Sequence, residues 1–192
     1  MILKEKFRRL FKDNDLLWLL DTVVDNEDDI PIGFYTSQWF SNFFLTDLDH
    51  YIKEKLKVKY YIRYADDMIL FGNNKKVLNN NRKLIEIYLN NENLMLKENY
   101  TLFKVDSRFI DFLGYRFYRG YTTLRRGIFL KIKRKTKRIY KKKYISLHNA
   151  YSMISYYGWI VHSNYYNFYN KYIKPYISID KCKKIISLTK KK

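Results

Sequence analysis

The sequence predicts an α+β fold in which short antiparallel hairpins pack on helices and a helical region follows. Apolar residues recur every three or four positions in 3–24, 75–92 and 125–143, a spacing typical of amphipathic helices. Two β-prone runs flank a pair of aspartates at 66–67, and two more such runs lie within 109–124. The 192 residues are enough for one domain, or for one domain and a small appendage.

The composition indicates a polyanionic partner. The chain holds 38 Lys and Arg against 19 Asp and Glu, which gives a formal net charge of +19. This balance favours nucleic acid, although an AT-rich genome would also enrich a protein in Lys, Asn, Ile, Tyr and Phe. The single Cys182 excludes an internal disulfide and fits a reducing compartment. Neither the N-terminus nor the uncharged stretch 145–170 has the pattern of a signal or membrane span, so we expect a cytoplasmic protein without a membrane partner.

The segment before the first hairpin has the pattern of a loop that leads into a ligand-facing helix. Two short helices and an acidic, solvated loop at 25–29 come first. Gly33 would let the backbone approach a ligand closely, and Thr36 or Ser37 can cap a helix that runs to about Leu56. The N-terminus of such a helix suits a phosphate or a base, but an ordinary loop-to-helix junction looks much the same.

The stretch 60–71 reads as a hairpin with two acids at its turn. Strand side chains alternate between faces, so neighbouring carboxylates can crowd one side only where the backbone turns. Asp66 and Asp67 are therefore expected together at the end of a sheet. Carboxylates that close repel each other unless a cation lies between them, and hard oxygen ligands suit Mg²⁺. For a lone Asp pair, a solvated turn is the alternative.

Three further elements follow the first hairpin. The periodicity predicts a helix over 75–92, and the alternation of Leu94 to Lys97 predicts the next strand. Residues 109–117 are expected to pair across Arg119 and Gly120 with 121–124.

The stretch 125–143 predicts a basic amphipathic helix. It contains eleven Lys and Arg and no acid, with Ile128, Ile132 and Ile139 on an apolar stripe. An all-positive helix repels itself unless something neutralises it, so this face favours the backbone of nucleic acid over mere solvation. Aromatic helices are expected between Ser146 and Tyr172.

Four motifs resemble those of reverse transcriptases, in the same order along the chain. They are Tyr-Ala-Asp-Asp at 64–67, Ile-Gly-x-x-x-Ser-Gln at 32–38, Phe-Leu-Gly-Tyr at 112–115, and Gly-Trp-x-x-His at 158–162. The Ile-Gly-x-x-x-Ser-Gln form is similar to that of diversity-generating retroelements, and it also resembles other prokaryotic retroelement and phage-defence enzymes. The last motif is similar to the thumb of reverse transcriptases and of group II intron maturases. The resemblance implies a prokaryotic RNA-directed DNA polymerase of bacterial or phage origin.

The resemblance also implies a domain organisation. Residues 1–124 would be a partial palm and residues 125–192 a basic helical thumb and tail. The fingers and the first palm strand would be absent, as in an N-terminally truncated polymerase.

The resemblance further implies roles for individual residues. Asp66 and Asp67 would be the catalytic carboxylates and would bind two Mg²⁺ ions, with Mn²⁺ as a substitute. The nucleotide and template pocket would be lined by Gly33, Ser37, Gln38, Tyr64, Ala65 and Lys97. The primer grip would consist of Leu113, Gly114 and Tyr115. The nucleic-acid backbone would lie on Arg125, Arg126, Lys133, Arg134, Lys137 and Arg138.

Two functional hypotheses remain open. Two-metal catalysis needs a further carboxylate from an earlier strand, and no substitute is expected among Asp21, Asp47, Asp49 and Asp111. The first hypothesis is therefore a polymerase portion that is inactive alone. It would act on RNA template, DNA primer and dNTPs together with an N-terminal half or an accessory protein. The alternative is an inactive remnant that binds RNA or hybrid duplex.

Overall fold

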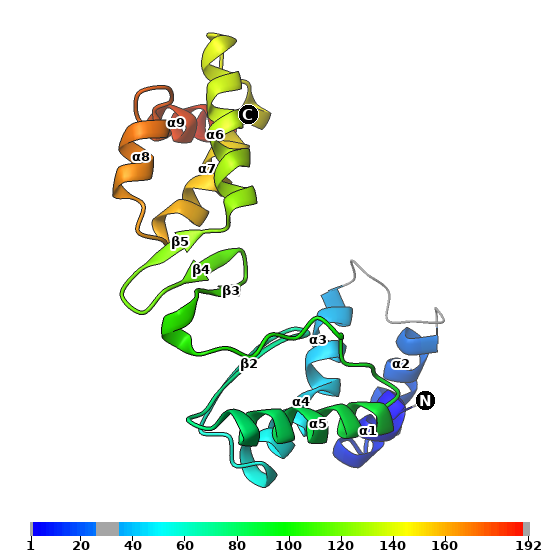
Figure 1. Cartoon of the computed structure of the whole chain (residues 1–192). Coiled ribbons are helices and arrows are strands. Elements are labelled where there is room, and N and C mark those ends of the chain that lie inside the picture. Colours follow the sequence, from blue (N-terminus) through cyan, green and yellow to red (C-terminus); the bar gives the residue numbers. More distant parts are fainter. Residues whose placement is uncertain (1, 26–34, 190–192) are drawn as a thin grey trace. The chain divides into compact units, whose positions relative to one another are not determined.

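A computed structural model describes residues 2–25 and 35–189, and it has the α+β character that the sequence predicts. The chain forms two compact units, Met1–Leu102 and Phe103–Lys192, each with helices and a small antiparallel sheet (Figure 1). No helix within the described ranges combines the length and the apolar character that a membrane crossing requires.

Three helices open the first unit, α1 (Ile2–Leu10), α2 (Asn14–Asp25) and α3 (Tyr35–Phe44). The two predicted N-terminal helices are thus confirmed. Their apolar faces meet in a cluster whose buried members are Leu3, Phe7 and Phe40. The Phe7 ring lies edge-on to Phe40, with 5.3 Å between the ring centroids, so aromatic contacts hold α1 against α3.

The predicted helix to about Leu56 is confirmed in its extent, but it is interrupted at Leu45, after α3. A second helix, α4, covers Thr46–His50, and a π-helical turn covers Tyr51–Lys55. At the break the Thr46 hydroxyl donates to the Asn42 carbonyl at 3.1 Å. A side chain that bonds back to the preceding turn in this way commonly bends a helix.

The first sheet is the hairpin of β1 (Tyr60–Tyr64) and β2 (Asp67–Phe71), followed by α5 (Lys75–Asn91). The helix matches the prediction for 75–92, and its N-terminus is capped by Asn74, whose side chain accepts from the Lys76 N–H at 2.8 Å. One face of the hairpin packs on helices. The buried residues of this core are Leu48, Ile52, Val58, Ile85 and Leu89.

The strand predicted at Leu94 to Lys97 is not formed. Helix α5 closes with Asn93 in the left-handed conformation (φ 57°), and the Leu94 N–H donates to the Leu89 carbonyl at 2.8 Å. The following residues pair with no strand in the described part of the chain, and Met95 is 91% exposed. Alternating polarity does not make a strand unless a sheet edge is available to pair with.

The second unit begins with a three-stranded sheet, β3 (Ile110–Phe112), β4 (Tyr115–Phe117) and β5 (Thr122–Leu124), in that spatial order. The predicted pairing across Arg119 and Gly120 is confirmed. However, 109–117 is not one strand, because a tight turn at Leu113 and Gly114 divides it into β3 and β4.

Four helices follow this sheet: α6 (Arg126–Lys141), α7 (Leu147–Val161), α8 (Tyr166–Tyr172) and α9 (Ile179–Thr189). The predicted basic helix and aromatic helices correspond to α6, α7 and α8. Their core contains Ile132, Met153, Ile160 and Cys182, each fully buried.

The compact unit starts at Phe103, whereas the sequence placed the domain boundary between 124 and 125. The sheet joins the helices that follow it because its side chains pack on them. Tyr115 stacks on Trp159 of α7, and the Thr122 N–H donates to the Asn164 side chain at 2.7 Å. The interpretation of the two parts as palm and thumb stays a prediction.

Candidate functional site

The turn between β1 and β2 presents two neighbouring carboxylates. Tyr64 pairs with Asp67 in the hairpin register, so the connection consists of Ala65 and Asp66 alone. Ala65 adopts the left-handed conformation (φ 50°) that two-residue hairpin turns require. Asp66 therefore lies at the tip and Asp67 is the first residue of β2.

An arginine on β1 fixes this turn to the helices beneath it. Arg63 donates from Nε to Asp49 Oδ1 at 2.8 Å and from Nη2 to Asp49 Oδ2 at 2.5 Å. Its Nη1 also donates at 3.1 Å to the Asn42 side chain and to the Ala65 carbonyl. The guanidinium thus connects α3, α4 and the turn in one hydrogen-bonded arrangement, which we call the Arg63 clamp.

The clamp is electrostatically strong. The hydrogen bond to Asp49 raises the pKa of Arg63 further above its ordinary value, even though partial burial opposes the shift. Tyr61, on the same face of β1, donates its hydroxyl to Asp49 at 2.8 Å, and burial together with this bond raises the pKa of Tyr61. Asp49 therefore accepts from two side chains of one strand, and the hairpin is held rigidly.

Both turn carboxylates are open to solvent. The Asp66 side chain is 75% exposed, and its Oδ2 lies 3.3 Å from Lys97 Nζ, whose side chain is 76% exposed. Asp67 is also exposed. Two adjacent, accessible oxygen donors are suited to Mg²⁺, but they supply only part of a ligand set. Across 2–25 and 35–189 no group of three or more acidic, His or Cys side chains is placed to hold a metal.

The other acids that the sequence raised as substitutes are engaged elsewhere. Asp49 belongs to the Arg63 clamp, and each of the remaining three forms its own ion pair. These pairs are Arg8–Asp21, Lys6–Asp47 with Arg9–Asp47, and Arg125–Asp111. Within the first unit, Asp21, Asp47 and Asp49 are thus each engaged by basic side chains.

The predicted nucleotide-pocket residues are only partly brought together. Gly33 lies outside the described residues. Ser37 is buried and Gln38 exposed, and both lie within the first turn of α3, so the prediction of Thr36 or Ser37 as its N-cap is wrong. The structure does place Lys97 against the acidic turn.

Sequence reasoning missed Arg63, Asp49 and Asn42. The position of Arg63 on β1 was a signal for its role. Every second side chain of this strand faces the helices, and Tyr61, two residues before Arg63, is one of the side chains that do so. A charged residue on such a face needs a partner. The identity of that partner, fourteen positions earlier, follows from no local pattern.

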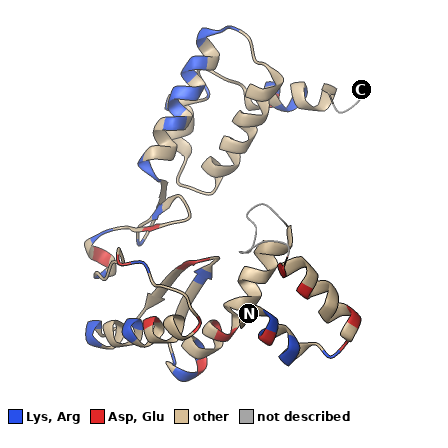
Figure 2. Ribbon diagram, turned by 90° about the vertical axis from the view of Figure 1, so that its right-hand side faces the viewer, with Lys and Arg blue, Asp and Glu red and all other residues tan. Residues whose placement is uncertain are grey.

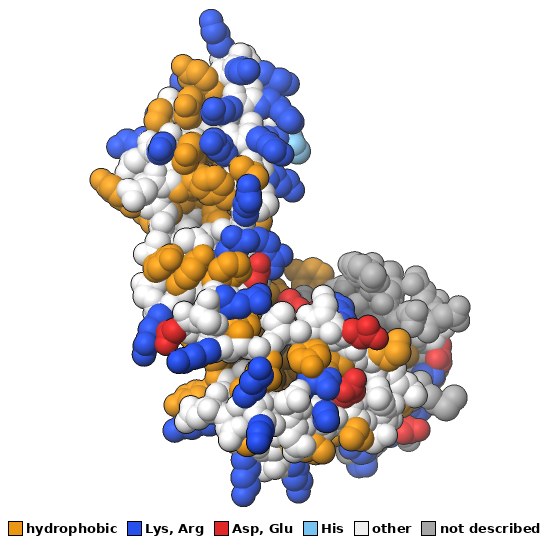
Figure 3. Space-filling model, viewed as in Figure 1, with side chains coloured by type: hydrophobic (Ala, Val, Ile, Leu, Met, Phe, Trp, Pro, Cys, Tyr) orange, Lys and Arg blue, Asp and Glu red, His pale blue; other side chains and the backbone are white. Residues whose placement is uncertain are grey.

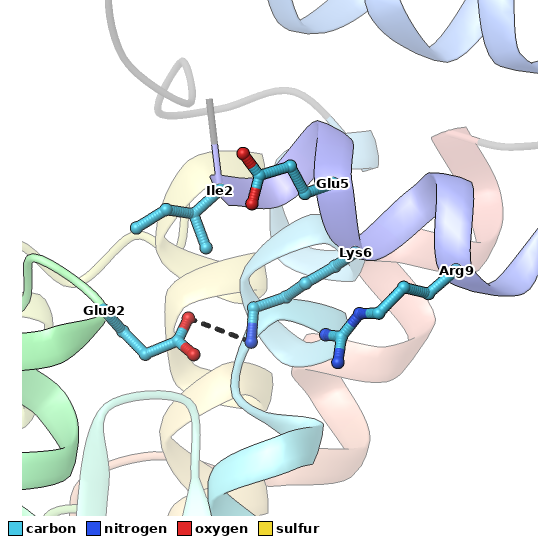
Figure 4. Close-up of a pocket in the computed structure, with 5 residues that line it drawn as sticks. All are labelled: Ile2, Glu5, Lys6, Arg9 and Glu92. Carbon is cyan, nitrogen blue, oxygen red and sulfur yellow. Dashed lines mark ion pairs between the residues drawn. The ribbon is translucent and has the colours of Figure 1, made fainter.

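A separate pocket of about 450 Å³ lies beside α1 and the end of α5 (Figure 4). Lys6, only 4% exposed, reaches Glu92 at 2.9 Å and Asp47 at 2.7 Å. Burial opposes protonation, but these two carboxylates outweigh it and raise the pKa of Lys6. Because the ammonium is already shared by two acids, this cluster explains how α1 is held and offers no free charge to a ligand.

The predicted primer-grip residues pack against α7. Leu113 (φ 49°) and Gly114 (φ 80°) form the turn, and Gly114 is buried against Trp159. Tyr115 stacks on the Trp159 ring with 5.4 Å between centroids and donates its hydroxyl to the Trp159 carbonyl at 3.0 Å. This turn is therefore well fixed within its own unit.

Helix α6 is basic along its length: its ribbon is repeatedly coloured blue for Lys and Arg in Figure 2, and blue side chains gather on this part of the surface in Figure 3. Of the six predicted backbone contacts, Arg125 pairs with Asp111 and Lys133 lies over the Tyr172 ring at 4.3 Å. The other four are exposed, and we call them the α6 basic face: Arg126, Arg134, Lys137 and Arg138.

Charge is divided unequally between the two units. Residues 103–192 contain 23 Lys and Arg against three Asp and Glu, a formal charge of +20. Residues 1–102 contain 15 Lys and Arg against 16 Asp and Glu, a formal charge of −1. The excess positive charge from which the composition predicts a polyanionic partner therefore lies in the second unit, whereas the acidic turn belongs to the first.

Comparison with known proteins supplies the family. The model of the reverse transcriptase family (RNA-dependent DNA polymerase) matches residues 22–117, half of the chain. The chain belongs to the reverse transcriptase family. The matched residues include the acidic hairpin, the Arg63 clamp and the turn at Gly114, while α6 to α9 lie beyond them.

A curated relative is itself a reverse transcriptase. The Retron Ec73 reverse transcriptase of Escherichia coli is 39% identical over 69 residues, a stretch that covers 33% of this chain and 22% of that protein. The chain thus aligns with about a fifth of the length of this relative. The assignment to a prokaryotic reverse transcriptase is confirmed, and the finer placement beside diversity-generating retroelements stays a prediction.

Proposed function

We propose that this chain is the catalytic-turn and nucleic-acid-binding part of an RNA-directed DNA polymerase that extends a DNA primer on an RNA template with dNTPs. The observation that carries the proposal is the hydrogen-bonded turn at which the consecutive residues Asp66 and Asp67 are both exposed, within the segment that matches the family. A fixed pair of carboxylates is what two-metal phosphoryl transfer needs from one side of its site.

In this proposal Asp66 and Asp67 hold Mg²⁺, for which Mn²⁺ can substitute. The ion supplies charge neutralisation at the transferred phosphate and at the attacking 3′ oxygen. The Arg63 clamp keeps the carboxylates in position before the ion binds, and Lys97 offers a positive charge beside Asp66 for the phosphates of the incoming nucleotide.

The remaining predicted residues serve substrate positioning. Gly33, Ser37, Gln38, Tyr64 and Ala65 line the nucleotide and template pocket. The turn of Leu113, Gly114 and Tyr115 positions the primer end, and the α6 basic face holds phosphates. We place the reaction in the cytoplasm.

No group of three acidic side chains among the described residues is placed to hold a metal, so we expect the 192-residue chain alone not to extend a primer. The missing ligand would come from another polypeptide, either an N-terminal reverse transcriptase half or an accessory protein. Supplying such a half should restore extension that Asp66→Asn abolishes.

The decisive experiment measures metal binding directly on the full chain. We expect bound Mn²⁺ to enhance water-proton relaxation, and we expect added Mg²⁺ to compete with it for the site. The affinity for Mn²⁺ should fall at least about tenfold in Asp66→Asn and in Asp67→Asn, since each substitution removes one charged ligand. Asp106→Asn is the matched control, because Asp106 is also exposed but lies in the other unit. Equal Mn²⁺ affinity in all four proteins would refute the assignment of the metal site.

The strong charge of the second unit supports an alternative, a nucleic-acid-binding protein without chemistry. Under this alternative, salt-sensitive binding to RNA or hybrid duplex is unaffected by Asp66→Ala and Asp67→Ala, and no added polypeptide restores primer extension.

A further inference from the structure

Four side chains of the second unit form a chain of contacts at the β4–β5 turn, in which one pair of rings, Tyr118 and Tyr121, is stacked and another, Phe109 and Tyr118, is tilted by 53°. The guanidinium of Arg116 lies over the Phe109 ring, 4.3 Å from its centroid. Phe109 contacts Tyr118 at 5.6 Å between centroids, and Tyr118 stacks on Tyr121 at 4.3 Å with only 12° between the ring planes. We call this arrangement the aromatic ladder.

The backbone fixes the last two rings of the ladder. Tyr118 and Tyr121 flank the Arg119–Gly120 turn, and the Tyr118 N–H donates to the Tyr121 carbonyl at 2.9 Å. Residues directly opposite each other on a hairpin present their side chains on the same face, so the two rings are held in register. The stack is therefore built into the hairpin.

The ladder is closed at one end and open at the other. The Arg116 cation covers Phe109, and Tyr118 lies between two rings, but Tyr121 has only the contact with Tyr118 among the rings and cations of the described chain. The Tyr121 side chain is 49% exposed. Among the described residues no ring or cation lies on the second face of Tyr121, and about half of the residue is open to solvent.

A stacked cross-strand tyrosine pair also stabilises a hairpin, and that role needs no ligand. Hairpin stability, however, is already served by the contacts of the half-buried Tyr115 with α7. The open ring belongs to a unit with a formal charge of +20, in which Arg119 beside it is 84% exposed. A flat aromatic surface in a strongly positive setting suits a base whose own phosphates are drawn to the surrounding charge.

We propose that an unpaired base of a single-stranded nucleic acid stacks on the open face of Tyr121 and extends the aromatic ladder by one ring. This inference rests on the proposed function, because it assumes that the second unit binds nucleic acid. The stacked base would be a contact that is insensitive to sequence, since every base has a π face. It would come in addition to phosphate contacts, whose strength depends on salt.

The test compares full-length variants in their binding to a single-stranded RNA of about twelve nucleotides. We expect Tyr121→Ala to weaken binding by about 5- to 100-fold, the range typical of one lost base stack, and Tyr121→Trp to retain it. Tyr151→Ala is the matched control, because Tyr151 is 47% exposed in the same unit and belongs to no ladder. Circular dichroism melts of each variant identify any loss of folding.

Two further readouts separate stacking from other causes. The salt dependence of the affinity should keep its slope in Tyr121→Ala, because no charge is removed, whereas Lys137→Ala should reduce it. An abasic site can be moved along the RNA, one position at a time. At one position, the loss of binding free energy caused by the abasic site and the loss caused by Tyr121→Ala should no longer add, as expected when both changes remove the same stacking contact.

Binding that is equal in the wild type, Tyr121→Ala and Tyr151→Ala would overturn the stacking inference and leave the proposed function intact. A folded Tyr121→Ala that binds weakly but shows full additivity with every abasic site would also overturn it. Absence of any RNA binding by the wild type would instead refute the nucleic-acid role of the second unit.

Discussion

The Arg63 clamp should determine the stability of the acidic turn. Replacing Arg63 by alanine removes two bonds to Asp49, one to Asn42 and one to the Ala65 carbonyl. The Arg63 side chain is 11% exposed and that of Asp49 30%, so the pair is largely but not completely removed from water. Breaking a fully buried pair costs about 3–5 kcal/mol, and partial exposure lowers this, so we expect a loss of about 2–3 kcal/mol.

The assay is urea denaturation of the full chain, followed by amide hydrogen exchange of β1 and β2. Arg63→Lys should recover little stability, because a lysine cannot reproduce the two-pronged contact of the guanidinium with Asp49. Arg8→Ala is the control, since the Arg8 side chain is 49% exposed and its pair with Asp21 should contribute less than about 1 kcal/mol.

A double-mutant cycle with Asp49→Ala tests whether the effect comes from the clamp. The combined variant should lose much less than the sum of the single losses, because both substitutions remove the same bonds. If Arg63→Ala unfolds within about 0.5 kcal/mol of the wild type and its hairpin amides exchange no faster, the clamp does not hold the turn.

Two further predictions concern the cores of the units. Lys6→Met should destabilise the first unit by about 1–3 kcal/mol at pH 7, a range reduced for the partial exposure of the acids that Lys6 pairs with. Burial raises the pKa of Asp47, but the hydrogen bonds from its cationic partners outweigh burial and lower this pKa below 3.8. The stabilisation is therefore complete above about pH 4 and is lost as the pH falls through the folded-state pKa of Asp47. In urea titrations, a stability difference between variant and wild type that is independent of pH would contradict this prediction. Gly114→Ala should cost about 2–5 kcal/mol, because its φ is +80° and an added Cβ would lie 2.5 Å from Trp159 Cζ3. Gly120→Ala, whose Cβ would meet nothing within 4 Å, should unfold like the wild type, and equal stability of the two alanine variants would refute the packing argument.

Elements with strong local periodicity were predictable from the sequence. The apolar stripe of 125–143 gives α6, with Ile132 and Ile139 buried as expected, and the β-prone runs around Asp66 give the first hairpin. In these segments the spacing of apolar residues and the turn residues agree, so local preference and tertiary packing select the same structure.

The failures have identifiable physical causes. The interruption at Leu45 leaves the backbone in the helical region, and the turn at Leu113 needs a left-handed non-glycine residue; neither changes the apolar period. The strand predicted near Lys97 has the right alternation but pairs with no sheet edge among the described residues. Helix α9 was not predicted, although Ile179 and Cys182 lie three residues apart and are both buried.

The candidate site was predictable in its residue types but not in its support. Asp66 and Asp67 follow from turn chemistry, whereas the contacts of Arg63 join residues 14 and 21 positions apart in the sequence. Such pairs depend on how helices pack under the hairpin. Sequence spacing alone carries no information about that packing.

The division of charge gives the two parts of the proposed function different physical controls. Mg²⁺ at Asp66 and Asp67 would be bound by coordination in a unit whose formal charge is −1, so added salt should weaken it only by screening two exposed carboxylates. Nucleic acid at the α6 basic face would be bound largely through counterion release by a unit of +20, so the same salt should weaken it much more steeply. If RNA affinity fell no more steeply with salt than Mn²⁺ affinity, counterion release at the α6 basic face would not account for nucleic-acid binding, and the assignment of that binding to the second unit would fail.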